Sequence, residues 1–473
     1  MKLNVITTIL FLFVFNLLNA QNNFSGVWNG TLNVAGSLRI VLHVTQAADG
    51  SYTATLDSPD QNATGINCDK VTVTGTTLVF AIDKIKVSYT GNLVNDTTLS
   101  GSFTQGVTIP LDFHRNATLF VAKVMNRPQT PKPPFPYKSE EVVYGGNGLQ
   151  YGGTITIPQG KGDFPAVLLI TGSGQQDRDE TIFNHKPFAV LADALTRDGF
   201  IVLRVDDRGI GNSTGNFQNS TTADFINDVN ASVEYLKTRK EVDDKKIGLL
   251  GHSEGAMIAP VVASQRKDIN FIVLMAAPGV NGIDLLTEQT AAVYKASGVD
   301  ENAVTSFKPV YKNLLTVISN AADTSIALQN ATQVMNNWYA QADKHILQQL
   351  GIPSEEYKTA VIKKIVSQAS SPWLKYFLTF NPQPYFANLK KVKVLALNGS
   401  RDIQVIAQQN LPPIRTALAD GKTKTFDVKE LPGLNHLFQT CIKCTVTEYG
   451  ELEETMAPVA LQTITGWLNK NVK

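Results

Sequence analysis

The sequence predicts an antiparallel all-β domain followed by an α/β domain, whose mostly parallel sheet is flanked by helices and interrupted by a helical insertion. Three observations predict this fold class. Short alternating strands, with turn residues about every 8–12 positions, run from residue 24 to residue 113. After a proline-rich stretch, continuous apolar runs alternate with helical stretches, as in parallel sheets buried on both faces. Between residues 278 and 392 no strand run occurs, and a segment of this length must fold for itself.

The composition is that of a neutral, folded protein. Its 473 residues suffice for two or three domains. Because 42 Lys and Arg residues balance 41 Asp and Glu residues, no bulk positive field attracts nucleic acid, and we expect no nucleic-acid partner. The 3 cysteines are too few for a disulfide-stapled scaffold or a four-cysteine zinc site. Cys441 and Cys444 are close in sequence, and both a small structural disulfide and free thiols remain open for them.

The first twenty residues predict a secretory signal peptide. Lys2 precedes an apolar run over residues 5–18, and the small Ala20 stands before the polar Gln21. The run is shorter than the ~20 residues of a spanning helix, and no other segment approaches that length. We therefore expect cleavage after Ala20 and a secreted or periplasmic protein without a membrane span.

Residues 21–124 are predicted to form the β-domain, as a barrel or a sandwich. Strand runs such as 38–44 and 78–82 are separated by turn signals such as Asp49-Gly50. The opening Gly26-x-Trp28-x-Gly30 is similar to the strand entry of lipocalin-type barrels. A ligand-carrying barrel and an accessory β-domain filled by its own side chains both remain open.

Residues 125–138 predict a linker, because five prolines crowd between positions 128 and 136. Residues 139–473 predict the α/β domain. Its strand runs lie at 166–170, 201–205, 247–250, 271–275 and 392–397. The helical insertion, at about residues 283–385, is expected to lie over the ends of the strands as a cap.

A serine on a sharp turn is the strongest chemical signal. Gly251-His252-Ser253-Glu254-Gly255 follows the strand run 247–250 and precedes a helix-like stretch. In this strand–turn–helix context, G-x-S-x-G places the serine hydroxyl above the sheet. Side chains at the two glycine positions would collide with the neighbouring strand and helix. We predict that Ser253 is a nucleophile.

A serine nucleophile needs a base, and in this architecture an acid and then a histidine follow the serine. Only His345 and His436 come after Ser253, and His345 falls inside the insertion. His436, in a loop beyond the strand run 424–428, is therefore the predicted base. Asp402, directly after the strand run 392–397, is the predicted acid and should accept a hydrogen bond from the imidazole.

An oxyanion hole needs two backbone N–H donors. The turn itself offers the amide of Glu254, and the glycine-rich loop over residues 171–179 should offer the second. We predict Ser173 for this donor, with Gly174 next. The loop matches neither phosphate-binding glycine motif, and no metal-ligand pattern occurs, so we expect no cofactor and no metal.

From about Glu140 to its end, the chain resembles secreted α/β-hydrolases of the serine hydrolase superfamily, near the serine-aminopeptidase-like and EstD-type carboxylesterase branches. The resemblance rests on the serine turn, on the loops around Asp402 and His436, and on Asp206-Asp207-Arg208-Gly209-Ile210-Gly211-Asn212-Ser213. It implies an α/β-hydrolase fold and hydrolysis of small-acyl esters. Thr171 departs from the histidine that many relatives carry, which leaves backbone donors intact.

We therefore expect a carboxylesterase-type serine hydrolase that cleaves short-chain esters through an acyl-enzyme, with a small-molecule ester as its partner. One alternative is an aminopeptidase of the same superfamily, resembling proline iminopeptidases. That activity needs acids in the insertion to hold the substrate's ammonium group, and the candidates are Glu288, Asp300, Glu301, Glu355 and Glu356. A second alternative is a secreted glycan- or lipid-binding protein without catalysis.

Two further features have a structural and a functional reading. Arg208 either binds a substrate carboxylate or pairs with Glu254 or Asp207, and we favour the pairing. An aromatic group at near-helical spacing either lines an acyl pocket or packs on the core, and we favour the core; it comprises Trp373, Tyr376, Phe377 and Phe380.

Overall fold

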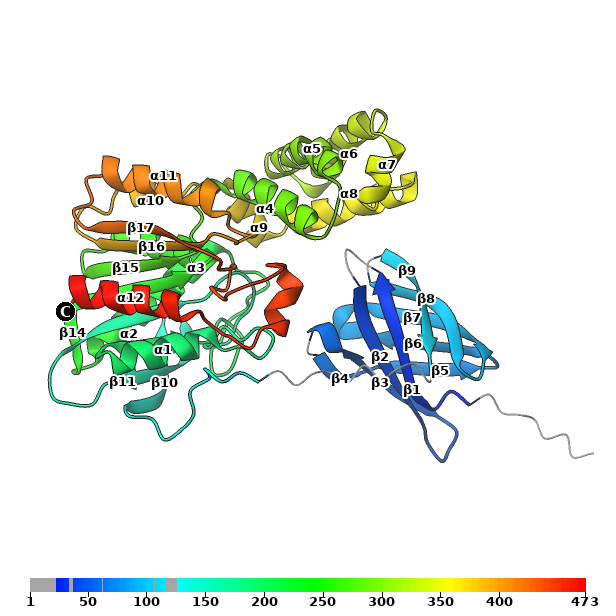
Figure 1. The fold of residues 1–473 in the computed structure, drawn as a ribbon, viewed down its shortest axis with the longest axis horizontal. Coiled ribbons are helices and arrows are strands. Elements are labelled where there is room, and N and C mark those ends of the chain that lie inside the picture. The colour runs from blue at the N-terminus through cyan, green and yellow to red at the C-terminus, as the bar shows by residue number, and fades with distance from the viewer. Residues whose placement is uncertain (1–22, 34–36, 62, 106, 116–125) are drawn as a thin grey trace, which may run out of the picture. The chain divides into compact units, whose positions relative to one another are not determined.

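The computed structural model describes residues 23–473 except 34–36, 62, 106 and 116–125 (Figure 1). The chain divides into two compact units, Met1–Ala122 and Lys123–Lys473. The sequence had predicted this boundary two residues later, after residue 124. The predicted signal peptide, residues 1–20, lies outside the described residues.

Within the described residues, the first unit is a nine-stranded antiparallel sheet with the strand order β4-β3-β2-β1-β9-β8-β7-β6-β5. β1 pairs with β9, which joins the two halves of the sheet. All other paired strands are consecutive in sequence. β4 and β5 are also consecutive but lie at opposite ends of the strand order. The strands are β1 (Gly26–Asn33), β2 (Ser37–Gln46), β3 (Tyr52–Ser58), β4 (Ala63–Asn67), β5 (Lys70–Thr74), β6 (Thr77–Ile82), β7 (Val87–Asn95), β8 (Thr98–Gln105) and β9 (Val107–His114).

The buried face of this sheet is covered by apolar side chains of its own strands. Burial alternates along the strands, as in β7, because successive side chains point to opposite faces. Trp28, Phe80 and Phe113 have no exposed surface, and Tyr89 stacks on Phe80 with ring centroids 5.3 Å apart. This packing supports the accessory β-domain over the ligand-carrying barrel.

The second unit is built on an eight-stranded sheet with the order β10-β11-β13-β12-β14-β15-β16-β17 (Figure 1). From β13 to β17 all neighbours are parallel, whereas β11 is antiparallel to both β10 and β13. The strands are β10 (Lys138–Gly146), β11 (Leu149–Ile157), β12 (Phe164–Ile170), β13 (Ile201–Val205), β14 (Val242–His252), β15 (Ile269–Met275), β16 (Lys393–Gly399) and β17 (Phe426–Leu431).

Helices flank this sheet because its central strands are apolar on both faces. Every residue from Ile247 to His252 is buried, as is every residue from Phe271 to Met275. Helix α1 packs beside α12, and α2 packs beside α3. The flanking helices are α1 (Pro187–Arg197), α2 (Thr222–Thr238), α3 (Glu254–Gln265), α11 (Ala407–Asp420) and α12 (Pro458–Asn471), and a 3-10 turn, η3 (Val446–Glu451), precedes α12.

A helical insertion lies between β15 and β16. Side-chain caps start several of its helices: Asn281 accepts the Asp284 amide at α4, and Asp323 accepts the Ile326 amide at α6. The insertion has an apolar core of its own around Phe307. Its helices are α4 (Gly282–Ala296), α5 (Glu301–Ser319), α6 (Thr324–Tyr339), α7 (Lys344–Gln349), α8 (Glu355–Ala369), α9 (Pro372–Thr379) and α10 (Gln383–Phe386). In the described part of the chain, no helix is both long and apolar enough to cross a membrane.

The proline-rich segment predicted as a linker is held by the second unit. The Arg127 guanidinium donates to the carbonyls of Phe183 (3.0 Å) and Gly450 (2.8 Å), and the Gln129 amide donates to the Met456 carbonyl (2.7 Å). These bonds provide hydrogen-bond donors for backbone carbonyls of the second unit. The part of the predicted linker that carries Arg127 and Gln129 is therefore fixed on the second unit.

Candidate active site

The turn between β14 and α3 holds Ser253 in a strained conformation. Its φ is +53° and its ψ is −113°, a region that non-glycine residues rarely adopt. The two flanking glycines make the turn possible. A Cβ on Gly251 would lie 2.1 Å from the Gly255 carbonyl oxygen, and a Cβ on Gly255 would lie 2.1 Å from that of Ile170. Ser253 as a whole remains half-buried, whereas its neighbours His252 and Glu254 are buried.

His436 and Asp402 meet at the same edge of the sheet. Asp402 lies three residues beyond β16 and His436 five residues beyond β17, and parallel strands bring their carboxyl ends together. His436 Nδ1 lies 2.8 Å from Asp402 Oδ2, and both residues are buried. The other carboxylate oxygen of Asp402 accepts the amides of Gln404 (2.7 Å) and Val405 (2.9 Å). These bonds fix the carboxylate so that it faces the imidazole.

The loop after β12 packs directly against the serine turn. A Cβ on Gly172 would lie 3.3 Å from the Ser253 Cβ. The Gly172 amide donates to Glu180 Oε1 at 2.7 Å and is therefore engaged. Among the described residues, the Ser173 amide has no hydrogen-bond partner. Ser173 directly follows Gly172 in this loop, and Glu254, the first residue of α3, directly follows Ser253; their role as oxyanion donors remains a prediction.

The Glu254 side chain ties the helical insertion to this site. Its Oε1 accepts the Thr222 hydroxyl at 2.6 Å and the Trp373 indole N–H at 2.9 Å, and the Ser173 side chain donates to the same carboxyl group. Burial raises the pKa of Glu254, while these three hydrogen bonds oppose the shift. Trp373 comes from α9, so one insertion helix contacts the residue directly after Ser253.

The remaining aromatic residues of that group pack as the sequence analysis favoured. Phe377 and Phe380 are buried in the main core, and Tyr376 packs against it.

A Glu–His pair that the sequence did not suggest lies beside the serine turn. His252 Nδ1 is 3.0 Å from Glu180 Oε1, and His252 Nε2 is 2.9 Å from the His436 carbonyl oxygen. The rings of His252 and His436 have centroids 4.7 Å apart. The one local signal was the histidine inside the serine motif; its partner Glu180 is 72 positions away, in a loop of another strand.

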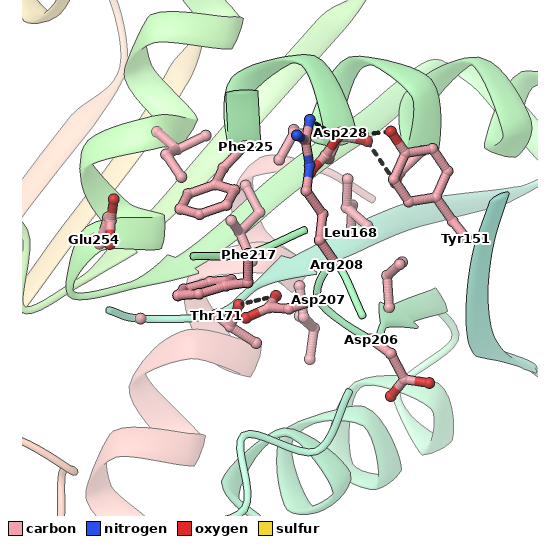
Figure 2. A pocket seen from close by; sticks show the side chains of 17 residues that line it. Tyr151, Leu168, Thr171, Asp206, Asp207, Arg208, Phe217, Phe225, Asp228 and Glu254 are labelled. Atoms are coloured by element: carbon pink, nitrogen blue, oxygen red, sulfur yellow. Dashed lines mark hydrogen bonds and ion pairs between the residues drawn. The ribbon is translucent and has the colours of Figure 1, made fainter. Parts of the chain in front are cut away.

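A cavity of about 60 Å³ is lined by Gly172, from the loop after β12, and by Glu254, the first residue of α3 (Figure 2). Ser253, Asp402 and His436 are not among its lining residues. Arg208 lines this cavity and does pair structurally, but its partner is Asp228 (2.7 and 2.8 Å) and not the predicted Glu254 or Asp207. Tyr151 also donates to Asp228, at 2.6 Å, as Figure 2 shows.

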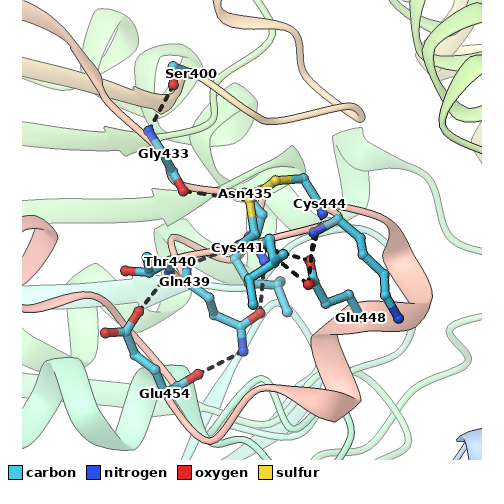
Figure 3. Close-up of a disulfide and its surroundings, with 12 residues drawn as sticks. Ser400, Gly433, Asn435, Gln439, Thr440, Cys441, Cys444, Glu448 and Glu454 are labelled. Atoms are coloured by element: carbon cyan, nitrogen blue, oxygen red, sulfur yellow. Dashed lines mark hydrogen bonds between the residues drawn. A yellow bond between two sulfur atoms is a disulfide. The ribbon is translucent and has the colours of Figure 1, made fainter.

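Cys441 and Cys444 form a disulfide a few residues beyond His436, and Cys68 is free (Figure 3). Glu448 lies close to both sulfurs, which makes this trio the one potential metal-ligand cluster found in the described residues. The cluster does not fit a metal ion, because disulfide sulfurs are not thiolates. Glu448 instead accepts the amides of Ile442, Lys443 and Cys444.

Comparisons with known proteins agree with this architecture. Residues 185–342 match the family described as "Serine aminopeptidase, S33". A stretch of 156 residues is 37% identical to Esterase EstD of Thermotoga maritima. The match covers 33% of this chain and 36% of EstD, so the chain spans about a third of the length of that relative.

Two solved structures also match parts of this chain at low identity. An esterase of Pyrococcus furiosus matches 74% of this chain and 99% of its own, with 15% identity and a TM-score of 0.40. A proline iminopeptidase of Mycobacterium smegmatis matches 70% of this chain and 98% of its own, with 12% identity and a TM-score of 0.40.

Proposed function

Because residues 123–473 form an α/β hydrolase similar to Esterase EstD, we propose that this chain is a secreted serine hydrolase that cleaves short-chain carboxylic esters. Ser253 is the nucleophile, His436 the general base and Asp402 the acid that orients the base. The observation that carries the proposal is the buried His436–Asp402 hydrogen bond, at the sheet edge where the strained Ser253 turn also ends.

The reaction proceeds in two steps. Ser253 Oγ attacks the ester carbonyl carbon while His436 Nε2 takes its proton, and Asp402 stabilises the resulting imidazolium. The tetrahedral oxyanion is held by the backbone amides of Glu254 and Ser173. The intermediate then collapses, the C–O bond to the alcohol breaks, and His436 gives its proton to the leaving oxygen. Water repeats the sequence on the acyl-enzyme and releases the acid.

Local features support the two oxyanion donors. Glu254 is the first residue of α3, where helix amides point outward without an intrahelical partner. The Ser173 amide has no partner in the described part of the chain. The bond from the Ser173 side chain to the Glu254 carboxyl group joins the two segments that carry these donors.

The helical insertion acts as a cap over this site and favours small acyl groups. The Trp373 indole, from α9, is hydrogen-bonded to the side chain of the residue after Ser253. A bulky ring held at this place leaves little room for a long acyl chain. The near-zero net charge gives no long-range attraction for charged substrates, which suits neutral esters.

Secretion has support beyond the predicted signal peptide. The Cys441–Cys444 disulfide is a bond that persists in oxidising compartments and is rare in the cytosol. Export through the signal peptide places the chain in such a compartment.

The proposal is tested by replacing the nucleophile. The Ser253→Ala variant should lose more than about 10³-fold in p-nitrophenyl acetate hydrolysis and all fluorophosphonate labelling, while its circular dichroism stays unchanged. Ser264→Ala is the matched control: Ser264 is on the same helix, bonds only the Val261 carbonyl, and should leave both signals intact. Undiminished turnover by Ser253→Ala would remove Ser253 from the mechanism.

The aminopeptidase alternative has the family description in its favour and the cap residues against it. Of the acids available to hold an ammonium group, Glu288 pairs with Lys308, Glu301 with Lys295, and Glu355 with Lys358. Asp300 caps α5. Aminoacyl-naphthylamides should therefore be cleaved far more slowly than esters.

Fluorophosphonate labelling alone distinguishes the enzyme from the non-catalytic alternative. A glycan- or lipid-binding protein with a vestigial hydrolase fold would leave the fluorophosphonate unreacted. Labelling at Ser253 supports the enzyme.

A further inference from the structure

We propose that His252 is a doubly protonated, positively charged imidazolium paired with Glu180. It fixes the loop after β17, which carries His436, relative to the loop after β12, which carries Gly172 and Ser173. The geometry that carries this inference is a chain of hydrogen bonds. It runs from the Gly172 amide through Glu180 Oε1 and the His252 ring to the His436 carbonyl oxygen. His252 is a positioning residue, because it acts through these two loops. Its effect on turnover rests on the proposed function, but its charge does not.

The hydrogen-bond partners of the two His252 ring nitrogens determine how many of these nitrogens carry a proton. A backbone carbonyl oxygen can only accept, so His252 Nε2 must donate to His436. Glu180 Oε1 already accepts the Gly172 amide, as a carboxylate does, and it also faces His252 Nδ1 at 3.0 Å. With acceptors on both sides, the ring satisfies both only when each nitrogen carries a proton.

A second buried histidine in the same chain provides the contrast. His185 is as deeply buried as His252, but its Nδ1 faces the Thr455 hydroxyl at 2.8 Å, and a hydroxyl can donate. His185 Nε2 faces the Tyr449 carbonyl oxygen at 2.9 Å and the Gln439 side-chain nitrogen at 3.1 Å. Because an amide nitrogen can only donate, the Gln439 contact needs a ring nitrogen without a proton and so fits a neutral ring. Burial lowers the pKa of His185 to about 4, in agreement with a neutral ring.

The charges around His252 favour the cation. Glu180 faces it from the loop after β12, Asp402 from the loop after β16, and His436 from the loop after β17. Burial alone lowers the pKa of His252, but the charge and hydrogen bond of Glu180, the His436 carbonyl and the Asp402 charge together raise it above its ordinary value. Glu180 itself has a φ of +53°, a strained backbone that holds its carboxylate against the Gly172 amide and the His252 ring.

This arrangement has one consequence for the proposed reaction. The Gly172 amide is held by Glu180, which restrains the backbone next to Ser173, the proposed second oxyanion donor.

The test reads the charge directly and does not depend on catalysis. In ¹⁵N-histidine-labelled protein, His252 should show the two similar nitrogen shifts of an imidazolium from pH 6 to pH 9, whereas His185 should show the separated pair of a neutral ring. The His252→Gln variant assigns the signal by its loss. A neutral His252 in the wild-type protein, with the proton on Glu180, overturns the proposal.

The Glu180 variants separate positioning from simple structural support. Glu180→Gln should make the His252 ring neutral, as its ¹⁵N shifts report, and should lower kcat/KM by about 10- to 100-fold. Glu180→Asp retains the charge and should keep the cation and restore most of kcat/KM. A His252 ring that stays doubly protonated in Glu180→Gln overturns the proposal. Absence of fluorophosphonate labelling in the wild-type protein would instead reject the proposed function and leave the charge of His252 measurable.

Discussion

His436 Nδ1 and Asp402 Oδ2 lie 2.8 Å apart in a buried setting, and the other Asp402 oxygen is occupied by two backbone amides. The carboxylate can therefore accept a hydrogen bond from a protonated Nδ1, and its bonds to the two backbone amides prevent it from rotating away. In the proposed reaction this hydrogen bond favours the tautomer with its proton on Nδ1, so that His436 Nε2 can accept the proton of Ser253.

Asp402→Asn should lower kcat by roughly 10⁴-fold with little change in fold. The amide can donate to Nδ1 and so favours the tautomer with its proton on Nε2, which cannot accept the serine proton. Steady-state kinetics on p-nitrophenyl acetate measure the loss. Asp420→Asn, an exposed acid at the end of α11, is the control and should retain wild-type kinetics. Equal rates for the two variants would contradict the role of Asp402.

Gly255→Ala should prevent stable folding of the second unit or cost more than about 3 kcal/mol in its free energy of unfolding. The added methyl group would meet the Ile170 carbonyl oxygen at 2.1 Å, and neither backbone can move without displacing β12 or α3. Gly466→Ala is the matched control. It lies in α12 with no atom near its Cβ and should gain roughly 0.5–1 kcal/mol, because alanine is the better helix former. Denaturant unfolding measures both, and a Gly255→Ala protein as stable as the wild type would contradict the packing argument.

The strand-end residues could be predicted from the sequence because topology fixes where they meet. Once β14, β16 and β17 are recognised as parallel strands, Ser253, Asp402 and His436 must emerge at one edge. The side-chain pairs between loops could not be predicted. Arg208 selects Asp228 over its neighbour Asp207 only because the loop after β13 folds against α2.

The same limit applies to Glu180, whose partner His252 depends on how the loop after β12 closes. The contacts of the proline-rich segment could not be predicted for a related reason: composition describes local stiffness, whereas Arg127 bonds Gly450, which lies 323 residues away in the chain.

The Cys441–Cys444 disulfide should contribute less stability than Glu448, which lies beneath it (Figure 3). A four-residue loop loses little entropy when it closes, so the Cys441→Ser/Cys444→Ser double variant should cost at most about 2 kcal/mol. Glu448→Gln should cost more, because the buried carboxylate accepts three backbone amides, and charge-assisted bonds are worth about 1.5–3 kcal/mol each. Glu451→Gln, exposed in the same turn, is the control. Denaturant unfolding midpoints rank the stability of the three variants. A larger loss of stability in the double cysteine variant than in Glu448→Gln would contradict the prediction.

Asp207 should make the protein less stable as the pH rises from about 4 to about 7. Its carboxyl group accepts the Thr171 hydroxyl at 2.9 Å and the Gln176 amide at 2.8 Å, but no cation pairs with it in the described part of the chain. Limited access to water raises its pKa to about 7, and the charges of Glu180 and Glu254 add to the shift. The folded state therefore binds a proton that the unfolded state, with an ordinary pKa of 3.8, releases earlier. This stabilisation is complete below about pH 4 and is lost by about pH 7.

Asp207→Asn removes the titrating group and keeps its shape. Its free energy of unfolding should equal that of the wild type near pH 4 and exceed it at pH 8, because only the wild-type protein must then bury a charge. Urea unfolding at stepped pH measures the difference, and Asp420→Asn should run parallel to the wild type throughout. A difference between Asp207→Asn and wild type that stays constant from pH 4 to pH 8 would show that Asp207 does not bind its proton more tightly in the folded state.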